Sequence, residues 1–353
     1  MAKIKKIAII APPVTTIPPA GQGGIEIILK YKIDALVKMG HQVFLYAAGN
    51  TDLENIHYIK IYEKSINERT LNPEVTEASR KMRLETTYIV SVIQHLIKNQ
   101  KKYDVVFNHT RATELVTSLV VEKLDIPILN VFHLPILPEH VEVLKNNPKC
   151  LAISISKDQI AECADLSNFV GTVHNGIDPE SYPPNFEPED FILWVGTIGH
   201  HKNPSDAIKV AKELNQKIYL IGKIRDQDYF EKEIKPEIND NVTYVGELNY
   251  SQKLPYFQKA KVALFPTKIR EACPVTPIEL AMCGTPVVAY SQGGTKELIK
   301  NGINGFLVGN LEEMIEKTKE AININRKQCH LFAKENFSSE VMAQKYLDIY
   351  RKV

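Results

Sequence analysis

The sequence has few cysteines and no excess of charge, and both absences exclude classes of protein. Only 5 of the 353 residues are cysteine, an odd number, and no two stand in a C-x-x-C pair, which argues against a disulfide framework and against a zinc-finger pattern. Basic and acidic residues number 43 and 42, which gives no electrostatic sign of a nucleic-acid-binding surface. No apolar run is long enough to span a membrane, and Ile7 to Ala11 is too short for a signal peptide. We therefore expect reduced thiols in a cytoplasmic protein.

Short apolar runs alternate with helical patterns along the whole chain. The helical segment IEIILKYKIDALVKMG carries one apolar face and ends at Gly40. That face consists of Ile25, Ile28, Leu29, Ile33, Leu36 and Val37. The expected strands are KKIAIIA, HQVFLYAA, YDVVFNH, IPILNVFH and CLAISIS, then FILWVGT, KIYLIG, VTYVGE, KVALFP, PVVAY and GFLV. This alternation predicts parallel sheets covered by helices on both faces.

A proline-rich stretch divides the two series of strands. The composition shifts between Gly171 and Asp190, and the sequence HNGIDPESYPPNFEPED has little periodicity, which is typical of a linker. We therefore expect an α/β protein of two tandem doubly wound, Rossmann-like domains, residues 1–174 and 175–337, facing across a cleft. A last helix at 338–353 follows the complete second sheet.

Open α/β sheets bind ligands at the carboxyl ends of their strands, so the loops after strands are where we expect chemistry. The first such loop, PPVTTIPPAGQGGIE, places Gly21, Gly23 and Gly24 before a helix, where backbone amides can approach an anion. It is not a G-x-G-x-x-G motif because position 26 is glutamate, which argues against NAD. A plain glycine turn into a helix explains this loop equally well.

The loop VGTIGHHKNPSDAI places Lys202 between a strand and a helix that opens with Pro204 and Ser205. A lysine there can neutralise a phosphate, although a lone lysine is usually a solvated surface residue. Further along, REACPVTPIELAMCGTPVVAYSQGG holds Glu271 in a loop after a strand and Glu279 in a T-P-I-E pattern. That pattern predicts a helix starting at Thr276 and a capping box, in which Glu279 bonds back to the amide of Thr276.

The two glutamates carry a resemblance to a known family. The segment EACPVTPIE resembles the E-x7-E signature of retaining glycosyltransferases with the two-domain GT-B architecture, similar to the family 4 group. Six segments recur in that family in this order: GQGGIE, HNGID, VGTIGHHKN, VGEL, EACPVTPIELAMCGTPVVAYSQGGTKELI and NGFLV. The resemblance covers essentially the whole chain. It implies that residues 1–174 bind the acceptor, that 175–337 bind the nucleotide sugar, and that the last helix packs back on the first domain.

The resemblance also implies roles for single residues. Glu271 would accept hydrogen bonds from hydroxyls of the donor sugar, Glu279 would accept from the ribose, and Lys202 would neutralise the diphosphate. His133, in NVFHLP, matches a family histidine that approaches the donor sugar, and with Glu271 and Lys202 it forms the implied catalytic set. Backbone amides near Gly23–Gly24 and Val275–Thr276 would hold the diphosphate, and Tyr244 to Gly246 the base. The implied donor site is therefore Gly23, Gly24, His201, Lys202, Tyr244, Val245, Gly246, Glu271, Val275, Thr276 and Glu279.

The sequence departs from the family at one point. Many members have an arginine next to the lysine or five residues before it, whereas this chain has His201 and Thr197 there. Lys202 is then the only permanent cation of the loop, and His201 is a candidate replacement for the arginine.

The implied function is transfer of a hexosyl group, with retention, from a UDP- or GDP-linked sugar to a hydroxyl acceptor in cell-envelope polysaccharide, glycolipid or small-glycoside synthesis. The resemblance implies no cofactor and no metal, and nucleotide sugar and acceptor as the partners. Two alternatives stay open: a sugar-nucleotide 2-epimerase of the same fold, and a non-catalytic nucleotide-sugar-binding protein.

The segment 79–102 has six basic residues and one acidic residue between Arg80 and Lys102. It could contact the inner face of a membrane, where a lipid-linked acceptor lies. The alternative is a core-facing helix with a solvated basic end, which is what charge on a helix face usually means.

Overall fold

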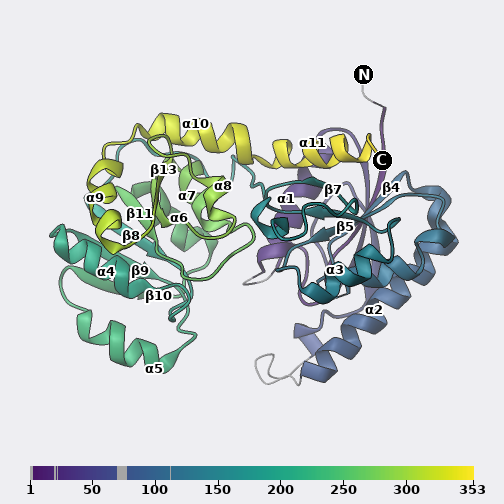
Figure 1. Cartoon of the computed structure of the whole chain (residues 1–353), viewed down its shortest axis with the longest axis horizontal. Coiled ribbons are helices and arrows are strands. Elements are labelled where there is room, and N and C mark those ends of the chain that lie inside the picture. Colours follow the sequence, from purple (N-terminus) through teal and green to yellow (C-terminus); the bar gives the residue numbers. More distant parts are fainter. Residues whose placement is uncertain (1–2, 20, 22, 70–77, 112) are drawn as a thin grey trace. The chain divides into compact units, whose positions relative to one another are not determined.

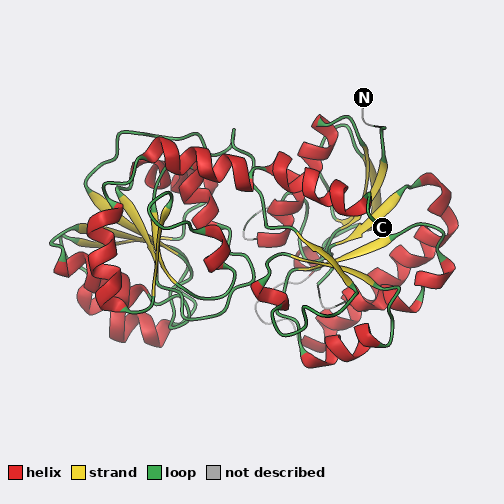
Figure 2. Cartoon of the chain, turned by 45° about the horizontal axis from the view of Figure 1, so that its top comes forward, coloured by secondary structure: helices red, strands yellow, loops and turns green. Residues whose placement is uncertain are grey.

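The computed structural model describes residues 3–19, 21, 23–69, 78–111 and 113–353 (Figure 1). These form two compact units. Unit 1 comprises Met1–Gly176 and Ser339–Val353, and unit 2 comprises Ile177–Ser338. In each unit a parallel β-sheet lies between helices (Figure 2).

Unit 1 contains a seven-stranded sheet in the order β3-β2-β1-β4-β5-β6-β7. The central strand pairs on both sides, with Ile7 opposite Val43 and Val105. Its strands are β1 (Lys6–Ile10), β2 (Gln42–Ala48), β3 (His57–Tyr62), β4 (Val105–Asn108), β5 (Ile128–Phe132), β6 (Leu151–Ser154) and β7 (Phe169–Thr172). Its α-helices are α1 (Gly24–Lys38), α2 (Ala78–Asn99), α3 (Pro138–Lys145) and α11 (Ser339–Tyr350). Short 3-10 turns are η1 (Asn67–Arg69), η3 (Gln100–Lys102), η4 (Glu114–Leu119), η5 (Val121–Lys123) and η6 (Asp158–Ile160).

Unit 2 contains a six-stranded sheet in the order β10-β9-β8-β11-β12-β13. Its strands are β8 (Phe191–Val195), β9 (Lys217–Ile221), β10 (Val242–Gly246), β11 (Val262–Phe265), β12 (Val287–Tyr290) and β13 (Gly305–Val308). Its α-helices are α4 (Pro204–Glu213), α5 (Gln227–Tyr229), α6 (Tyr250–Lys259), α7 (Thr276–Met282), α8 (Thr295–Leu298), α9 (Leu311–Ala321) and α10 (Arg326–Phe337). The π-helix η7 (Phe230–Ile234) and the 3-10 helix η8 (Lys235–Glu237) follow α5.

The strand order reverses once in each sheet, between β1 and β4 in unit 1 and between β8 and β11 in unit 2. At such a point the loops after the two neighbouring strands lead to opposite faces of the sheet and leave a crevice at their carboxyl ends. The loops that follow β8 and β11 contain Lys202 and Glu271. Both residues therefore lie at the crevice where a ligand is expected, and they form a candidate site.

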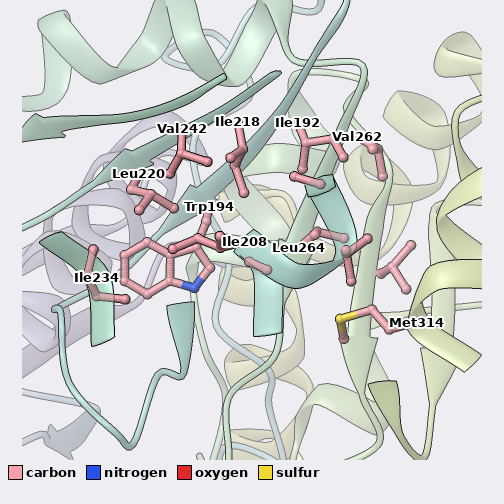
Figure 3. Close-up of a cluster of buried hydrophobic side chains, with 14 of the residues drawn as sticks. Ile192, Trp194, Ile208, Ile218, Leu220, Ile234, Val242, Val262, Leu264 and Met314 are labelled. Atoms are coloured by element: carbon pink, nitrogen blue, oxygen red, sulfur yellow. The ribbon is translucent and has the colours of Figure 1, made fainter. Parts of the chain in front are cut away.

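The core of unit 2 surrounds the only tryptophan of the chain, Trp194 on β8 (Figure 3). Ile208, Leu220 and Ile234 pack around it, and the indole Nε1 donates to the carbonyl oxygen of Lys202 at 3.3 Å. The apolar core therefore holds the backbone of the lysine loop directly.

The last helix, α11, belongs to unit 1 and packs against α1. Its Tyr346 is buried, with its ring 5.3 Å from that of Phe107 on β4. Unit 1 is thus completed by residues that follow unit 2 in the sequence.

The predicted class of two Rossmann-like α/β domains is confirmed, and all eleven expected strands are present. Two strands were missed, β3 and β7. Both are edge strands and neither has a fully buried residue, so neither forms a continuous apolar run. The predicted linker region also began too early, because Gly171 and Thr172 belong to β7. On α1, the expected core residues Ile28, Leu29, Ile33 and Leu36 are buried, whereas Ile25 and Val37 are half-buried.

The packing around Trp194 can be tested with Leu264→Ala, since Leu264 is buried in the same cluster. Truncation leaves a cavity, and we expect the free energy of unfolding of unit 2 to fall by about 2–5 kcal/mol. Urea unfolding followed by the fluorescence of Trp194 measures this change. Leu331→Ala, at a 41% exposed position of α10, is the matched control and should change it by less than about 0.5 kcal/mol. Equal effects of the two substitutions would contradict the cluster.

Candidate functional site

The two loops at the strand reversal of unit 2 meet in an ion pair. Lys202 Nζ lies 2.6 Å from Glu271 Oε1, and the two side chains are 19% and 22% exposed. Lys202 comes from the loop after β8 and Glu271 from the loop after β11, 69 positions later. The structure therefore brings together the two residues that the sequence proposed for phosphate and sugar contacts.

Glu271 is held through both its side chain and its backbone. Thr267 Oγ1 donates to Glu271 Oε1 at 3.2 Å, and the amide of Gly294 donates to the carbonyl oxygen of Glu271 at 2.8 Å. Gly293 has φ +52°, and a Cβ there would lie 2.5 Å from that carbonyl oxygen. A side chain at Gly293 would thus be strained and would displace the loop. The glycine at this position therefore allows Glu271 to lie where it does.

His201 precedes Lys202 in the same loop, and its side chain is hydrogen-bonded to that of Thr197. Thr197 is the other position where similar sequences have an arginine. The Nε2 atom of His201 is 2.9 Å from Thr197 Oγ1. Partial burial, together with the charges of Lys202 and Arg225, lowers the pKa of His201. In the ligand-free protein His201 is therefore neutral at pH 7 and adds no permanent positive charge.

A pocket of about 730 Å³ opens next to His201 within unit 2. It is lined by His201, Arg225, Asp226, Gln227, Asp228 and Ile269. Sequence reasoning missed Arg225, although it follows β9 at the same edge of the sheet and supplies a permanent cation near the lysine loop. The run R-D-Q-D begins three residues after the end of the predicted strand KIYLIG, and this place in a loop was the available signal.

The predicted capping box at Glu279 is wrong. The helix α7 does begin at Thr276, but its N-cap is Val275 and no side chain caps it. Glu279 is buried, and its Oε1 accepts from the hydroxyl of Tyr182 at 2.5 Å and from Lys253 Nζ at 3.4 Å. Tyr182, which lies in the proline-rich segment far away in sequence, donates to the carboxylate that the local pattern had predicted to cap the helix.

The other residues proposed for the donor site in unit 2 lie at separate positions of the same edge. Val275 and Thr276 form the start of α7, where the carbonyl of Val275 accepts from the amides of Ile278 and Glu279. Tyr244, Val245 and Gly246 end β10, which β9 separates from β8. The tyrosine hydroxyl donates to Gly222 O at 2.8 Å, and Gly222 N donates to Gly246 O at 2.8 Å. Their contacts with a ligand stay predictions.

Three of the proposed residues belong to unit 1. Gly24 is the first residue of α1 and Gly23 its N-cap, where a Cβ would lie 2.7 Å from Pro19 Cβ. His133 follows β5 directly and is half-buried. Its Nε2 lies 2.9 Å from Nδ1 of His109, which sequence reasoning missed.

The basic segment 79–102 forms α2 and the following turn η3. Tyr88, Ile89, Val92 and Leu96 are buried on one face of α2, while the basic side chains gather near both ends of the segment. None of the helices in the described part of the chain is long and apolar enough to cross a bilayer. Contact with a membrane surface stays a prediction.

Comparison with known proteins agrees with this geometry. Residues 180–337, nearly the whole of unit 2, match the family model of Glycosyl transferases group 1. Unit 2 is therefore similar to the group 1 glycosyltransferase domains. An uncharacterized glycosyltransferase from Methanocaldococcus jannaschii is 24% identical over 331 residues, covering 82% of each chain.

Solved structures resemble the whole chain, not the group 1 domain alone. AviGT4, a glycosyltransferase involved in avilamycin A biosynthesis, has a TM-score of 0.73 at 20% identity over 99% of this chain and 97% of its own. The Anabaena protein HepE, solved in complex with UDP-glucose, has a TM-score of 0.68 at 16% identity over 99% of this chain and 100% of its own. At these identities the likeness establishes the fold, which is that of GT-B glycosyltransferases.

The hydrogen bond between Tyr182 and Glu279 can be measured in a double-mutant cycle with Tyr182→Phe and Glu279→Gln. A hydrogen bond to a charged group contributes about 1.5–3 kcal/mol, so we expect a coupling energy of at least about 1 kcal/mol between the two substitutions. Urea unfolding of the four proteins provides the free energies. If the two effects simply add, the hydroxyl does not stabilise this carboxylate.

Proposed function

We propose that this protein is a retaining glycosyltransferase that moves a sugar from a UDP- or GDP-linked donor to a hydroxyl acceptor. The observation that carries the proposal is the Lys202–Glu271 pair at the strand reversal of the group 1 domain. One side chain is a phosphate ligand and the other accepts hydrogen bonds from sugar hydroxyls. The UDP-glucose complex of a protein with the same fold supports a nucleotide-sugar donor.

The ion pair indicates how the donor is received. Without ligand, Lys202 and Glu271 satisfy each other, so neither charge is left uncompensated in a partly buried position. When the donor binds, its diphosphate replaces Glu271 as the partner of Lys202, and its sugar hydroxyls donate to the released carboxylate. The exchange keeps both charges paired and makes the site selective for ligands that carry both groups.

Charge develops on the diphosphate as it leaves, so stabilising that charge contributes most to catalysis. In this proposal Lys202 stabilises that charge, and Arg225 and His201 line the adjacent pocket. The amides at Val275–Thr276 add donors, Glu279 accepts from the ribose, and the base lies at Tyr244 to Gly246. The departing phosphate takes the proton of the acceptor hydroxyl, and the configuration at the anomeric carbon is retained.

A donor screen tests the proposal. Purified protein is incubated with UDP-, GDP- and ADP-sugars, nucleotide release is measured with candidate hydroxyl acceptors, and products are identified by mass spectrometry. Acceptor-dependent release of one nucleotide supports the transferase. Conversion of the donor into an isomeric sugar without transfer supports a 2-epimerase, and saturable binding without turnover supports a binding protein. Either of these results overturns the proposal.

Glu271→Ala tests the role of the carboxylate at the sugar. We expect turnover to fall by at least about a hundredfold, equivalent to roughly 2.7 kcal/mol of lost transition-state stabilisation, while the free nucleotide still binds. Initial rates and calorimetric titration with UDP or GDP measure the two quantities. Glu316→Ala, at an exposed carboxylate of α9, is the control and should retain full activity. Undiminished turnover in Glu271→Ala would exclude the assigned role.

His201 gives donor binding a defined pH dependence. Its pKa is lowered in the free protein, and a bound diphosphate would raise it because the charged form gains a partner. Binding therefore takes up a proton. Affinity should rise as the pH falls from about 8 towards about 6, and the gain is lost as the pH rises through the pKa of the complex. Each unit of difference between the two pKa values gives at most about tenfold in affinity.

Calorimetric affinities for the intact nucleotide sugar at both pH values measure this effect. His201→Gln should abolish the slope while retaining a hydrogen-bonding side chain. Identical slopes for the two proteins would show that His201 does not replace the missing arginine.

A further inference from the structure

Lys32 is fully buried in unit 1. It lies on α1, four residues after Ile28 and four before Leu36, and so faces the core. Its Nζ lies over the ring of Tyr346 at 3.4 Å and over that of Phe107 at 3.9 Å. Burial holds the pKa of Lys32 well below its usual range.

The only side chain that hydrogen-bonds this lysine in the described part of the protein is His109. Lys32 Nζ lies 2.8 Å from His109 Nε2, and its other partners there are the two aromatic rings. Buried lysines are normally paired with a carboxylate because an unpaired charge is costly to desolvate. A buried lysine paired with an imidazole instead of a carboxylate is not expected to stabilise the fold. This pairing therefore suggests that Lys32 has a functional role.

The contact continues through a second imidazole. His109 directly follows β4 and His133 directly follows β5, and these strands are neighbours in the sheet. His109 Nδ1 lies 2.9 Å from His133 Nε2. Lys32 and His109 are fully buried, whereas His133 is half-buried, so the chain of three side chains runs from the core to the carboxyl edge of the sheet.

The donors in this chain can be ordered from its buried end. Burial and the neighbouring positive charge lower the pKa values of both histidines, so both imidazoles are neutral. A neutral imidazole has one N–H and one acceptor nitrogen, and an ammonium group only donates. The rings of Tyr346 and Phe107 favour the ammonium form of Lys32 and so oppose the effect of its burial. As an ammonium group Lys32 donates to His109 Nε2, so the hydrogen of His109 is on Nδ1 and is donated to His133 Nε2. The hydrogen of His133 is then on Nδ1.

We propose that Lys32 is a positioning residue that acts through His109 to fix the tautomer of His133, so that His133 presents an Nδ1–H donor at the carboxyl edge of the unit 1 sheet. This inference rests on the proposed function for its ligand, an oxygen of the sugar substrate. The two aromatic rings support the arrangement because they favour a cation at Nζ. Tyr346 comes from α11, so the C-terminal helix contributes to setting the histidine.

A purely structural role for Lys32 predicts something different. It would hold α11 against α1 through Tyr346, and replacing it would change stability without changing the protonated nitrogen of His133. The position of that hydrogen therefore distinguishes the two roles, and it can be observed without any substrate.

The decisive experiment is nitrogen NMR of the full-length protein with ¹⁵N-labelled histidine. The protein has ten histidines, and the signals of His133 are assigned by their loss in His133→Gln. In the wild-type protein we expect His133 to carry its hydrogen on Nδ1. Lys32→Met keeps the length and apolar stem of the side chain but removes the donor. We expect at least half of the His133 population to move its hydrogen to Nε2, because His109 Nε2 no longer has to accept from Lys32 and His133 can then donate to His109 Nδ1.

Lys30→Met is the matched control. Lys30 lies on the same helix, is partly exposed and pairs with Asp34, so its loss should leave the His133 signals unchanged. If Lys32→Met does not fold, His109→Leu carries the same test, since it removes the donor that faces His133 Nε2. Unchanged His133 signals in the folded variant, or a wild-type hydrogen on Nε2, would overturn the proposal.

A second readout links the tautomer to turnover. With the donor identified by the screen, Lys32→Met should lower kcat on the order of tenfold, as loss of a group that orients a ligand-contacting histidine does, with the donor KM changed less than about twofold. An unchanged kcat in a protein whose tautomer has shifted would refute the link to the reaction. If no donor is turned over at all, the proposed function fails, while the NMR result still decides whether Lys32 sets the tautomer.

Discussion

In a parallel sheet, the loops that follow the strands all begin at the same edge of the sheet, and both units of this protein depend on that constraint. In unit 2 it places the loop after β8 beside the loop after β11, so Lys202 and Glu271 meet although they are far apart in sequence. In unit 1 it places the ends of β4 and β5 side by side, so His109 meets His133. The candidate functional side chains of each unit therefore lie where the strands end.

The parts that could be predicted from the sequence are those with a short-range cause. Central strands such as β8 and β11 are continuous apolar runs because they are buried on both faces. Once those runs are identified, the loops that contain Lys202 and Glu271 follow, and the helix after Glu271 starts at Thr276 as its proline indicates. Two Rossmann-like domains and the selection of these loops needed no more than that.

The parts that could not be predicted depend on long-range contacts. The pattern T-P-I-E satisfies every local condition for a capping box, but Tyr182 bonds to Glu279 instead, from a segment with no periodicity. Lys32 sits where the helical period requires an apolar residue, and only the tertiary structure reveals the two rings and the imidazole that accommodate its amine. Arg225 could be assigned to a loop after a strand, but nothing in its own segment shows that it lies near His201, so its part in the pocket could not be predicted.

The membership of α11 in unit 1 has a consequence for the order in which the protein can mature. A chain leaving the ribosome presents β1 to β7 first, and N-terminal domains generally fold as they emerge. Tyr346, however, is made only after all of unit 2. Until then Lys32 lacks one of its two aromatic neighbours. The packing around its amine can therefore be completed only after the residues of α11 have been synthesised.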